Sequence, residues 1–178
     1  MNKLVKAKPY AEPSRTQDDE GQFLTFHLGG EMFAIGILGI KEIIEYGQIT
    51  SVPMMPSFVR GVINLRGQVV PVIDLQLRFG RSNTEAGKRA CIVIADVESE
   101  IEGERQEIGL IVDAVSEVLA IPPGDIEPAP AFGAKLRQDF VSGMGKVNGK
   151  FVIILNVENV LSINELAELA NQVNEFAS

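Results

Sequence analysis

The sequence predicts an all-β fold made of two similar small units, and three observations point to it. Valine and isoleucine, whose branched side chains favour pleated strands over helices, are the two most frequent residues of the 178-residue chain. Short apolar runs of strand length alternate with turns that contain glycine or proline. Finally, two segments of the first half recur in the second half in the same order.

The first strands are expected just after a polar segment. Residues 1–21 contain prolines and show no hydrophobic periodicity, so we expect a flexible N-terminal tail. Apolar and polar residues alternate in "FLTFHL" (23–28), and Gly29-Gly30 suits a tight hairpin into "EMFAI" (31–35). In the next segment, 36–45, three isoleucines at helical spacing predict a short helix or turn after the second strand.

The rest of the chain continues the pattern of strands and ends in a predicted helix. Ser162 and Glu165 form a capping box, and an apolar stripe follows them, so we expect a C-terminal helix over 162–178. Before it, the sequence predicts strands within 57–77, 90–97 and 106–115, a Pro-rich loop over 121–133 and a final hairpin over 145–157.

The internal repeat isolates one pair of charged residues. Residues 33–44 align with 108–119, and residues 61–75 align with 143–157, without gaps. Glu42 is matched by Glu117, but Arg66, in the Gly-bounded hairpin expected within 61–75, is matched by Asn148. An arginine next to a glutamate is therefore expected in the first half only. Such a pair can be a recognition element or an ordinary solvated ion pair, and the sequence leaves both open.

Composition argues against several classes of function. The net charge of −8 disfavours nucleic acid, and no apolar run has the length of a membrane span or a secretory signal, so we expect a cytoplasmic protein. His27 is the only histidine and Cys91 the only cysteine, which excludes disulfides and leaves little for zinc sites or nucleophilic catalysis. We expect no enzyme activity and no cofactor, and a binding function.

Several blocks of the sequence resemble the CheW chemotaxis coupling proteins. They are "GIKEIIEYGQITSVPMMPSFVR", "GVINLRGQVVPVIDL", "EIGLIVDAVSEVLAIPPGDIEPAP" and "GMGKVNGKFVIILNVENVL", and the resemblance extends over 22–161. It implies two packed SH3-like, five-stranded β-barrels, the first at about 30–80 and the second at about 88–161, and it leaves open whether strand 23–28 joins the second. The N-terminal tail and the acidic insert "ESEIEGERQE" (98–107) depart from the family pattern.

The resemblance also implies the partners and their sites. Family members are adaptors that join the tips of methyl-accepting chemoreceptors to the regulatory domain of the histidine kinase CheA, and ring assembly with other CheW molecules is possible. Receptor binding uses a groove between the barrels, to which we assign Val112 and Val115. The family's coupling residues fall at six positions of this sequence: Ile40, Glu42, Asn64, Leu65, Arg66 and Gly67.

The sequence leaves two further functions open. The chain can be a CheW-like adaptor of another chemosensory-type pathway, such as twitching motility or development. A small β-barrel enzyme or ligand carrier that uses acidic residues is the candidate from a different class. It would contain a closed, ligand-sized cavity and a bound metal or cofactor.

Overall fold

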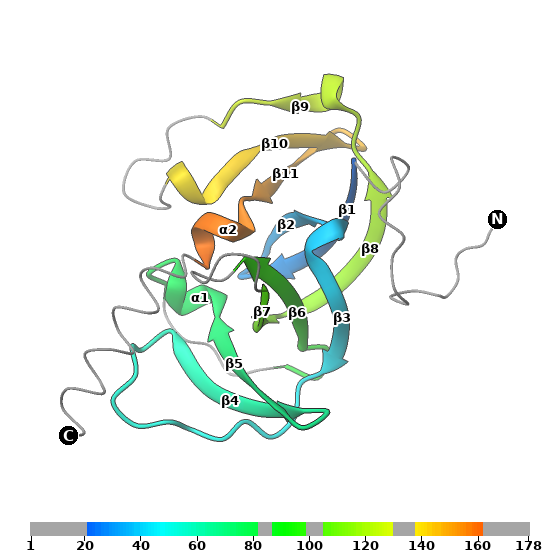
Figure 1. The fold of residues 1–178 in the computed structure, drawn as a ribbon. Helices are drawn as coiled ribbons and strands as arrows, with labels where there is room; N and C mark the ends of the chain where they lie inside the picture. Colours follow the sequence, from blue (N-terminus) through cyan, green and yellow to red (C-terminus); the bar gives the residue numbers. More distant parts are fainter. Residues whose placement is uncertain (1–20, 82–86, 99–104, 130–137, 162–178) are drawn as a thin grey trace.

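The fold of the described residues is almost entirely β (Figure 1). The computed structural model describes residues 21–81, 87–98, 105–129 and 138–161. The predicted N-terminal tail, apart from Gly21, and the predicted C-terminal helix lie outside these residues. No helix in the described part of the chain has the length and apolarity needed to cross a membrane.

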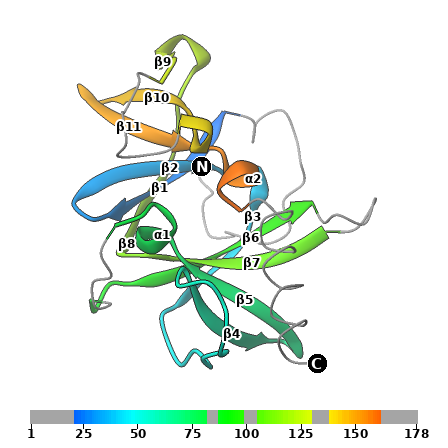
Figure 2. The same cartoon turned by 90° about the vertical axis from the view of Figure 1, so that its left-hand side faces the viewer.

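The strands form two sheets, which stack with one above the other (Figures 1 and 2). The six-stranded sheet has the order β8-β1-β2-β11-β10-β9, and the five-stranded sheet has the order β3-β6-β7-β5-β4. The strands of the first sheet are β1 (Gln22–Leu28), β2 (Glu31–Gly36), β8 (Ala114–Ala120), β9 (Ile126–Glu127), β10 (Val141–Val147) and β11 (Lys150–Leu155). Those of the second are β3 (Ile40–Glu45), β4 (Val59–Leu65), β5 (Gln68–Asp74), β6 (Cys91–Glu98) and β7 (Arg105–Val112).

Helical structure among the described residues is limited to single turns. Two α-helical turns, α1 (Leu75–Arg78) and α2 (Val157–Val160), follow the second strands of the two repeated hairpins. Three 3-10 turns cover Ile37–Gly39, Pro123–Asp125 and Gln138–Phe140. The short helix predicted after the second strand is thus the turn at Ile37–Gly39. The helical spacing of the isoleucines was misleading beyond it, because Ile40–Glu45 is strand β3, whose consecutive Ile43 and Ile44 pack into different apolar clusters.

The two repeats exchange their first hairpins. Hairpin β1–β2 pairs with β8 and, in parallel, with β11, which belong to the second repeat. Hairpin β6–β7 pairs with β3 and, in parallel, with β5, which belong to the first. The sheets therefore do not follow the predicted division at about 30–80 and 88–161 for these hairpins. Strand 23–28 lies in the six-stranded sheet as β1, the placement that the family resemblance left possible.

Three apolar clusters form the core, and one of them joins the two subdomains. One lies inside the curve of each sheet, and the largest lies between the sheets. Because strand residues alternate between the two faces of a sheet, a strand such as β6 contributes to two clusters. Ile92 and Ile94 enter the cluster inside the five-stranded sheet. Val93, Ala95 and Val97 enter the cluster between the sheets. Each sheet is thus buried on both faces along its central strands.

The repeat predicted from the sequence is visible in the turns after each hairpin. Asp74 caps α1 by accepting hydrogen bonds from the backbone N–H groups of Gln76 at 3.0 Å and Leu77 at 3.3 Å. Asn156, its counterpart, caps α2 by accepting from the N–H of Asn159 at 3.0 Å. Asp74 is buried and also forms an ion pair with Arg60, a contact that ties the cap to strand β4.

Glycines at the start of both hairpins permit close packing of the backbone. Gly61 and Gly143 each lie at a register shift between the two strands of their hairpin. At Gly61, φ is +152°, and a Cβ atom would overlap the carbonyl oxygen of Thr50. Thr50 and Val62 exchange two backbone hydrogen bonds of 2.9 Å across this point, so the backbone of Thr50 cannot move away freely.

We expect Gly61→Ala to destabilise the protein by about 1–3 kcal/mol, because the new methyl group meets fixed backbone and the φ value is unfavourable for alanine. Urea denaturation followed by circular dichroism measures the change. Gly36→Ala is the matched control, since a Cβ atom there meets nothing within 4 Å, and we expect a change within about 0.5 kcal/mol. Equal stability of the two variants would contradict the expectation.

Candidate functional site

The tip of hairpin β4–β5 is a tight two-residue turn. Leu65 pairs with Gln68, and between them Arg66 and Gly67 have φ values of 53° and 85°. Two consecutive left-handed residues match the twist of the flanking strands, as in type I′ hairpins. The side chain of Asn64 accepts a hydrogen bond of 2.9 Å from the N–H of Gly67 and fixes the turn. The backbone therefore holds the Arg66 side chain at a defined place.

Arg66 and Glu42 form a two-pronged ion pair that joins the two edges of the five-stranded sheet. Arg66 donates from Nη1 to Oε1 of Glu42 at 3.3 Å and from Nη2 to Oε2 at closer range. Glu42 lies on β3 and Arg66 at the tip of β4–β5, so the sheet curls until its first and last strands meet. The hydrogen bond to Glu42 and its negative charge raise the pKa of Arg66 above the usual value, so the guanidinium stays charged.

The pair remains open to solvent on one side. The Arg66 side chain is 65% exposed and that of Glu42 is 24% exposed. Beside it, Lys41 and Glu107 form a second ion pair at 3.6 Å. Val69, opposite Asn64 in the hairpin, is 71% exposed and adds an apolar side chain. We call Glu42, Asn64, Arg66, Gly67 and Val69 the hairpin surface.

The structure brings together most of the residues that the resemblance selected. Glu42, Asn64, Arg66 and Gly67 lie on the hairpin surface, whereas Leu65 is half-buried and packs on the cluster inside the five-stranded sheet. Ile40 is different: it is only 4% exposed and belongs to the cluster between the sheets. In this conformation Ile40, one of the six positions that the resemblance selected, therefore does not lie on the surface, because its side chain faces the core.

The two valines assigned to a groove also face the core. Val112 is fully buried in the cluster between the sheets, and the half-buried Val115 packs against that cluster. Conversely, the sequence reasoning missed Val69, Lys41 and Glu107. Alternation along "QVVPV" could have identified Val69, because Val70 and Val72 are buried and Val69 points to the opposite face of the strand.

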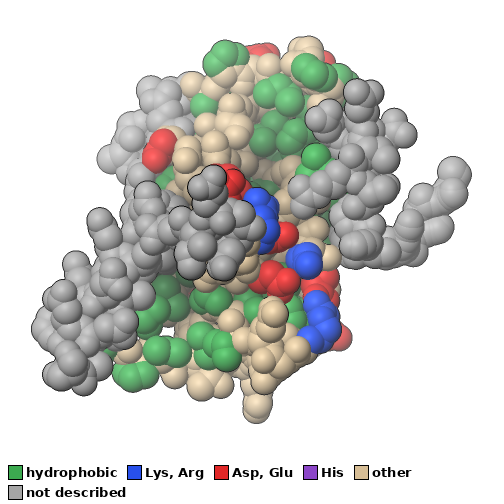
Figure 3. All heavy atoms as spheres, viewed as in Figure 1, with side chains coloured by type: hydrophobic (Ala, Val, Ile, Leu, Met, Phe, Trp, Pro, Cys, Tyr) green, Lys and Arg blue, Asp and Glu red, His purple; other side chains and the backbone are tan. Residues whose placement is uncertain are grey.

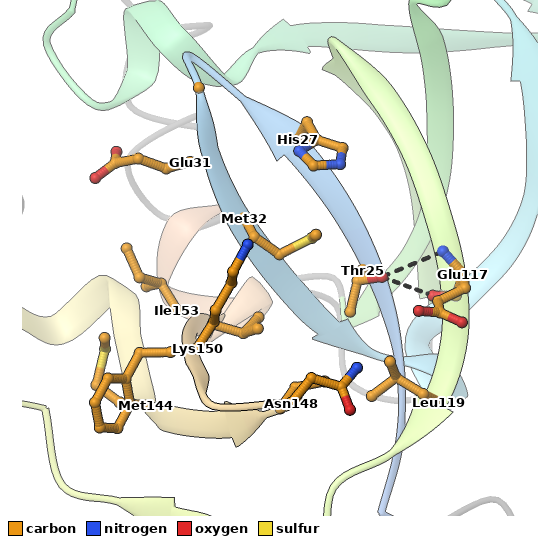
Figure 4. A pocket seen from close by; sticks show the side chains of 14 residues that line it. Thr25, His27, Glu31, Met32, Glu117, Leu119, Met144, Asn148, Lys150 and Ile153 are labelled. Atoms are coloured by element: carbon orange, nitrogen blue, oxygen red, sulfur yellow. Dashed lines mark hydrogen bonds between the residues drawn. The ribbon is translucent and has the colours of Figure 1, made fainter.

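The second hairpin repeats the turn but not the ion pair. Asn148 and Gly149 have φ values of 50° and 79°, close to those of Arg66 and Gly67. The counterpart of Glu42, Glu117 on β8, lies across a groove of about 650 Å³ from the β10–β11 hairpin (Figure 4). His27 on β1 also lines this groove, while Cys91 packs against the cluster between the sheets.

Charged and apolar side chains are mixed on the surface. Figure 3 shows acidic and basic side chains next to each other on one part of the face seen in Figure 1, with hydrophobic side chains above and below them. The described residues of this face form no uniformly basic area, in keeping with the net charge of −8.

Comparisons with known proteins identify the family. The profile of the CheW-like domain matches residues 22–165, the region that contains both sheets. The chain belongs to the CheW-like family. In the crystal structure of the scaffolding protein TtCheW from Thermoanaerobacter tengcongensis, a chain with 35% sequence identity superposes with a TM-score of 0.71, over 81% of this chain and 89% of that one.

Curated relatives of this CheW-like protein agree. The chemotaxis protein CheW of Klebsiella aerogenes is 35% identical over 150 residues, 84% of this chain and 87% of that protein. Protein FrzA of Myxococcus xanthus is 27% identical over 153 residues, 86% of this chain and 89% of that protein. CheW-like proteins are scaffold and adaptor proteins of chemotaxis signalling and not enzymes, which confirms the expected absence of catalysis.

We expect Asn64→Ala to lower the free energy of unfolding by about 0.5–1.5 kcal/mol, because the N–H of Gly67 loses its side-chain acceptor. Asn64→Asp keeps an acceptor oxygen at the same place and serves as the control, with a smaller loss. Chemical denaturation of the three proteins under the same buffer measures the difference. An alanine variant as stable as the parent would show that the turn does not depend on this hydrogen bond.

Proposed function

We propose that this CheW-like protein is a non-enzymatic adaptor that joins methyl-accepting chemoreceptors to a CheA-type histidine kinase. It binds the cytoplasmic receptor tips and the regulatory domain of the kinase. Membership of the CheW-like family and relatives named as chemotaxis proteins support this role. The protein itself is expected in the cytoplasm and reaches membrane-associated receptor arrays through its partners.

The observation that carries the proposal is the preorganised hairpin surface. The left-handed turn, the Asn64 hydrogen bond and the Glu42 carboxylate hold Arg66 in one place while most of its side chain stays exposed. A partner that binds a side chain already fixed loses less conformational entropy than one that must order it. Arginine also offers directed donors for carboxylates or carbonyl groups of a partner. The surface therefore suits recognition of the kinase or the receptor.

The two-subdomain architecture suits an adaptor with more than one partner. Each sheet carries its own hairpin, and the two hairpin tips differ in charge. Different faces of one rigid body can therefore bind different proteins at the same time. Within an array, linked sites raise the effective concentration, so that modest individual affinities are sufficient. Ring assembly with further CheW molecules would add to this effect.

We expect Arg66→Glu to reduce kinase stimulation by about tenfold or more, since it places two carboxylates together and reverses the charge offered to the partner. The measurement is autophosphorylation in a reconstituted mixture of receptor, adaptor and kinase. Circular dichroism should show an intact fold, because Arg66 is exposed. Normal stimulation by a folded Arg66→Glu protein would refute the role of the hairpin surface.

A charge-swapped double variant separates recognition from structure. Glu42→Arg combined with Arg66→Glu can restore an ion pair between the sheet edges, but it presents the charges in reverse. If Arg66 recognises a partner, the double variant remains defective. Restored stimulation would mean that the ion pair only closes the sheet.

A second candidate is an adaptor of another chemosensory-type pathway, such as one that controls twitching motility or development. The similarity to protein FrzA of Myxococcus xanthus, a relative whose name does not describe it as a chemotaxis protein, supports this candidate. Pull-down of the regulatory domains of all CheA-type kinases of the same organism distinguishes the two pathways. Selective capture of a kinase that is not the one controlling flagella would favour this second pathway.

A further inference from the structure

The groove in the six-stranded sheet is a second surface feature, distinct from the hairpin surface. It is lined by β1, β2 and β8 on one side and by the β10–β11 hairpin on the other (Figure 4). Its apolar wall includes Met32, Leu119, Met144 and Phe151, and Phe151 is 52% exposed. A volume of about 650 Å³ is enough for several side chains of a partner.

The repeat explains why this groove is open. In the five-stranded sheet, the corresponding place is filled by Leu65, Arg66 and Ile94, and Glu42 pairs with Ile94 across the strands. In the six-stranded sheet the corresponding residues are smaller: Val147 replaces Leu65 and Asn148 replaces Arg66.

Thr25 occupies the position in the six-stranded sheet that Ile94 occupies in the five-stranded sheet. Its hydroxyl group exchanges hydrogen bonds of 2.9 Å and 3.2 Å with the backbone of Glu117. The same backbone plan therefore leaves space where the other sheet has aliphatic side chains and a guanidinium group.

Glu117 is the counterpart of Glu42, but the counterpart of Arg66 is the uncharged Asn148. Among the described residues, no lysine or arginine forms an ion pair with it, whereas Glu42 holds Arg66. Lys150 is the basic residue of the groove wall, and in Figure 4 its side chain extends toward Met32, on the opposite side of the groove from Glu117. The side of the groove next to Glu117 thus combines an apolar wall with a carboxylate that has no ion-pair partner within the described part of the chain.

We propose that this groove binds a β-hairpin tip of a partner protein that carries an arginine next to an aliphatic residue. The arginine pairs with Glu117, and the aliphatic side chain packs on Leu119 and Met32. The partner thus supplies in trans the groups that Leu65 and Arg66 supply within the five-stranded sheet.

The position of β8 supports this occupant. Strand β8 is an edge strand of its sheet and pairs only with β1 among the described strands. Its outer edge can therefore form backbone hydrogen bonds with an added strand. Val118 on this strand is another exposed apolar residue. The negative carboxylate, together with the outer edge of β8, with which no described strand pairs, favours a basic hairpin over an acidic peptide.

A cyclised peptide with the sequence of residues 63–70, INLRGQVV, is a suitable probe because it copies the hairpin tip that meets Glu42. We expect it to bind the intact protein and to shift the backbone NMR signals of residues that line the groove. Isothermal titration calorimetry gives the affinity, which should weaken as NaCl is raised. Glu117→Gln should weaken binding by about fivefold or more, because it removes a charge-assisted hydrogen bond.

Two matched controls make the outcome decisive. The peptide INLNGQVV, with the asparagine found at the second hairpin, should bind at least about fivefold more weakly than INLRGQVV. Glu98→Gln removes an exposed glutamate of the other sheet and should leave the affinity unchanged.

Phe151→Ser tests the apolar wall, and we expect weaker binding without loss of fold. The proposal is overturned if the arginine peptide does not bind. It is equally overturned if Glu117→Gln binds as well as the parent, or if the shifted signals lie away from the groove.

Discussion

The apolar cluster between the two sheets is the constraint on which the rest of the structure depends. Phe26 and Phe33 from the six-stranded sheet pack there with Phe79 and Phe140, and strands of the five-stranded sheet add Val93, Leu110 and Val112. Burial of this area is the main source of stability, and it fixes how one subdomain lies on the other. Both hairpin tips then stand at defined places on one rigid body.

Pseudo-symmetry gives the two subdomains the same backbone and different chemistry. The left-handed turns at Arg66-Gly67 and Asn148-Gly149 are nearly identical, and Asp74 and Asn156 cap equivalent helical turns. The side chains at the tips differ, so that one sheet is closed by an ion pair and the other is open at a groove. One backbone plan can in this way offer two different surfaces.

Local features of the sequence predicted local features of the structure, whereas strand pairing over long distances was not predictable in the same way. Gly29-Gly30 marks a turn that is present, and the repeat placed Glu42 and Arg66 at positions where they meet. Strands β2, β6 and β11 are apolar on both faces, so their patterns do not say which strand lies next to them. In β3, a register shift leaves Ile40 facing the core while Glu42 reaches the surface, and alternation in the sequence does not reveal such an irregularity.

The exchanged hairpins have a consequence for fragments of the chain. The five-stranded sheet is built from the continuous segment between β3 and β7, which is inserted between β1–β2 and β8–β11. A single cleavage between β7 and β8 would leave β1–β2 on one piece and its pairing partners on the other. Neither piece could complete the six-stranded sheet alone, but the two could reassemble when mixed, as in a split reporter.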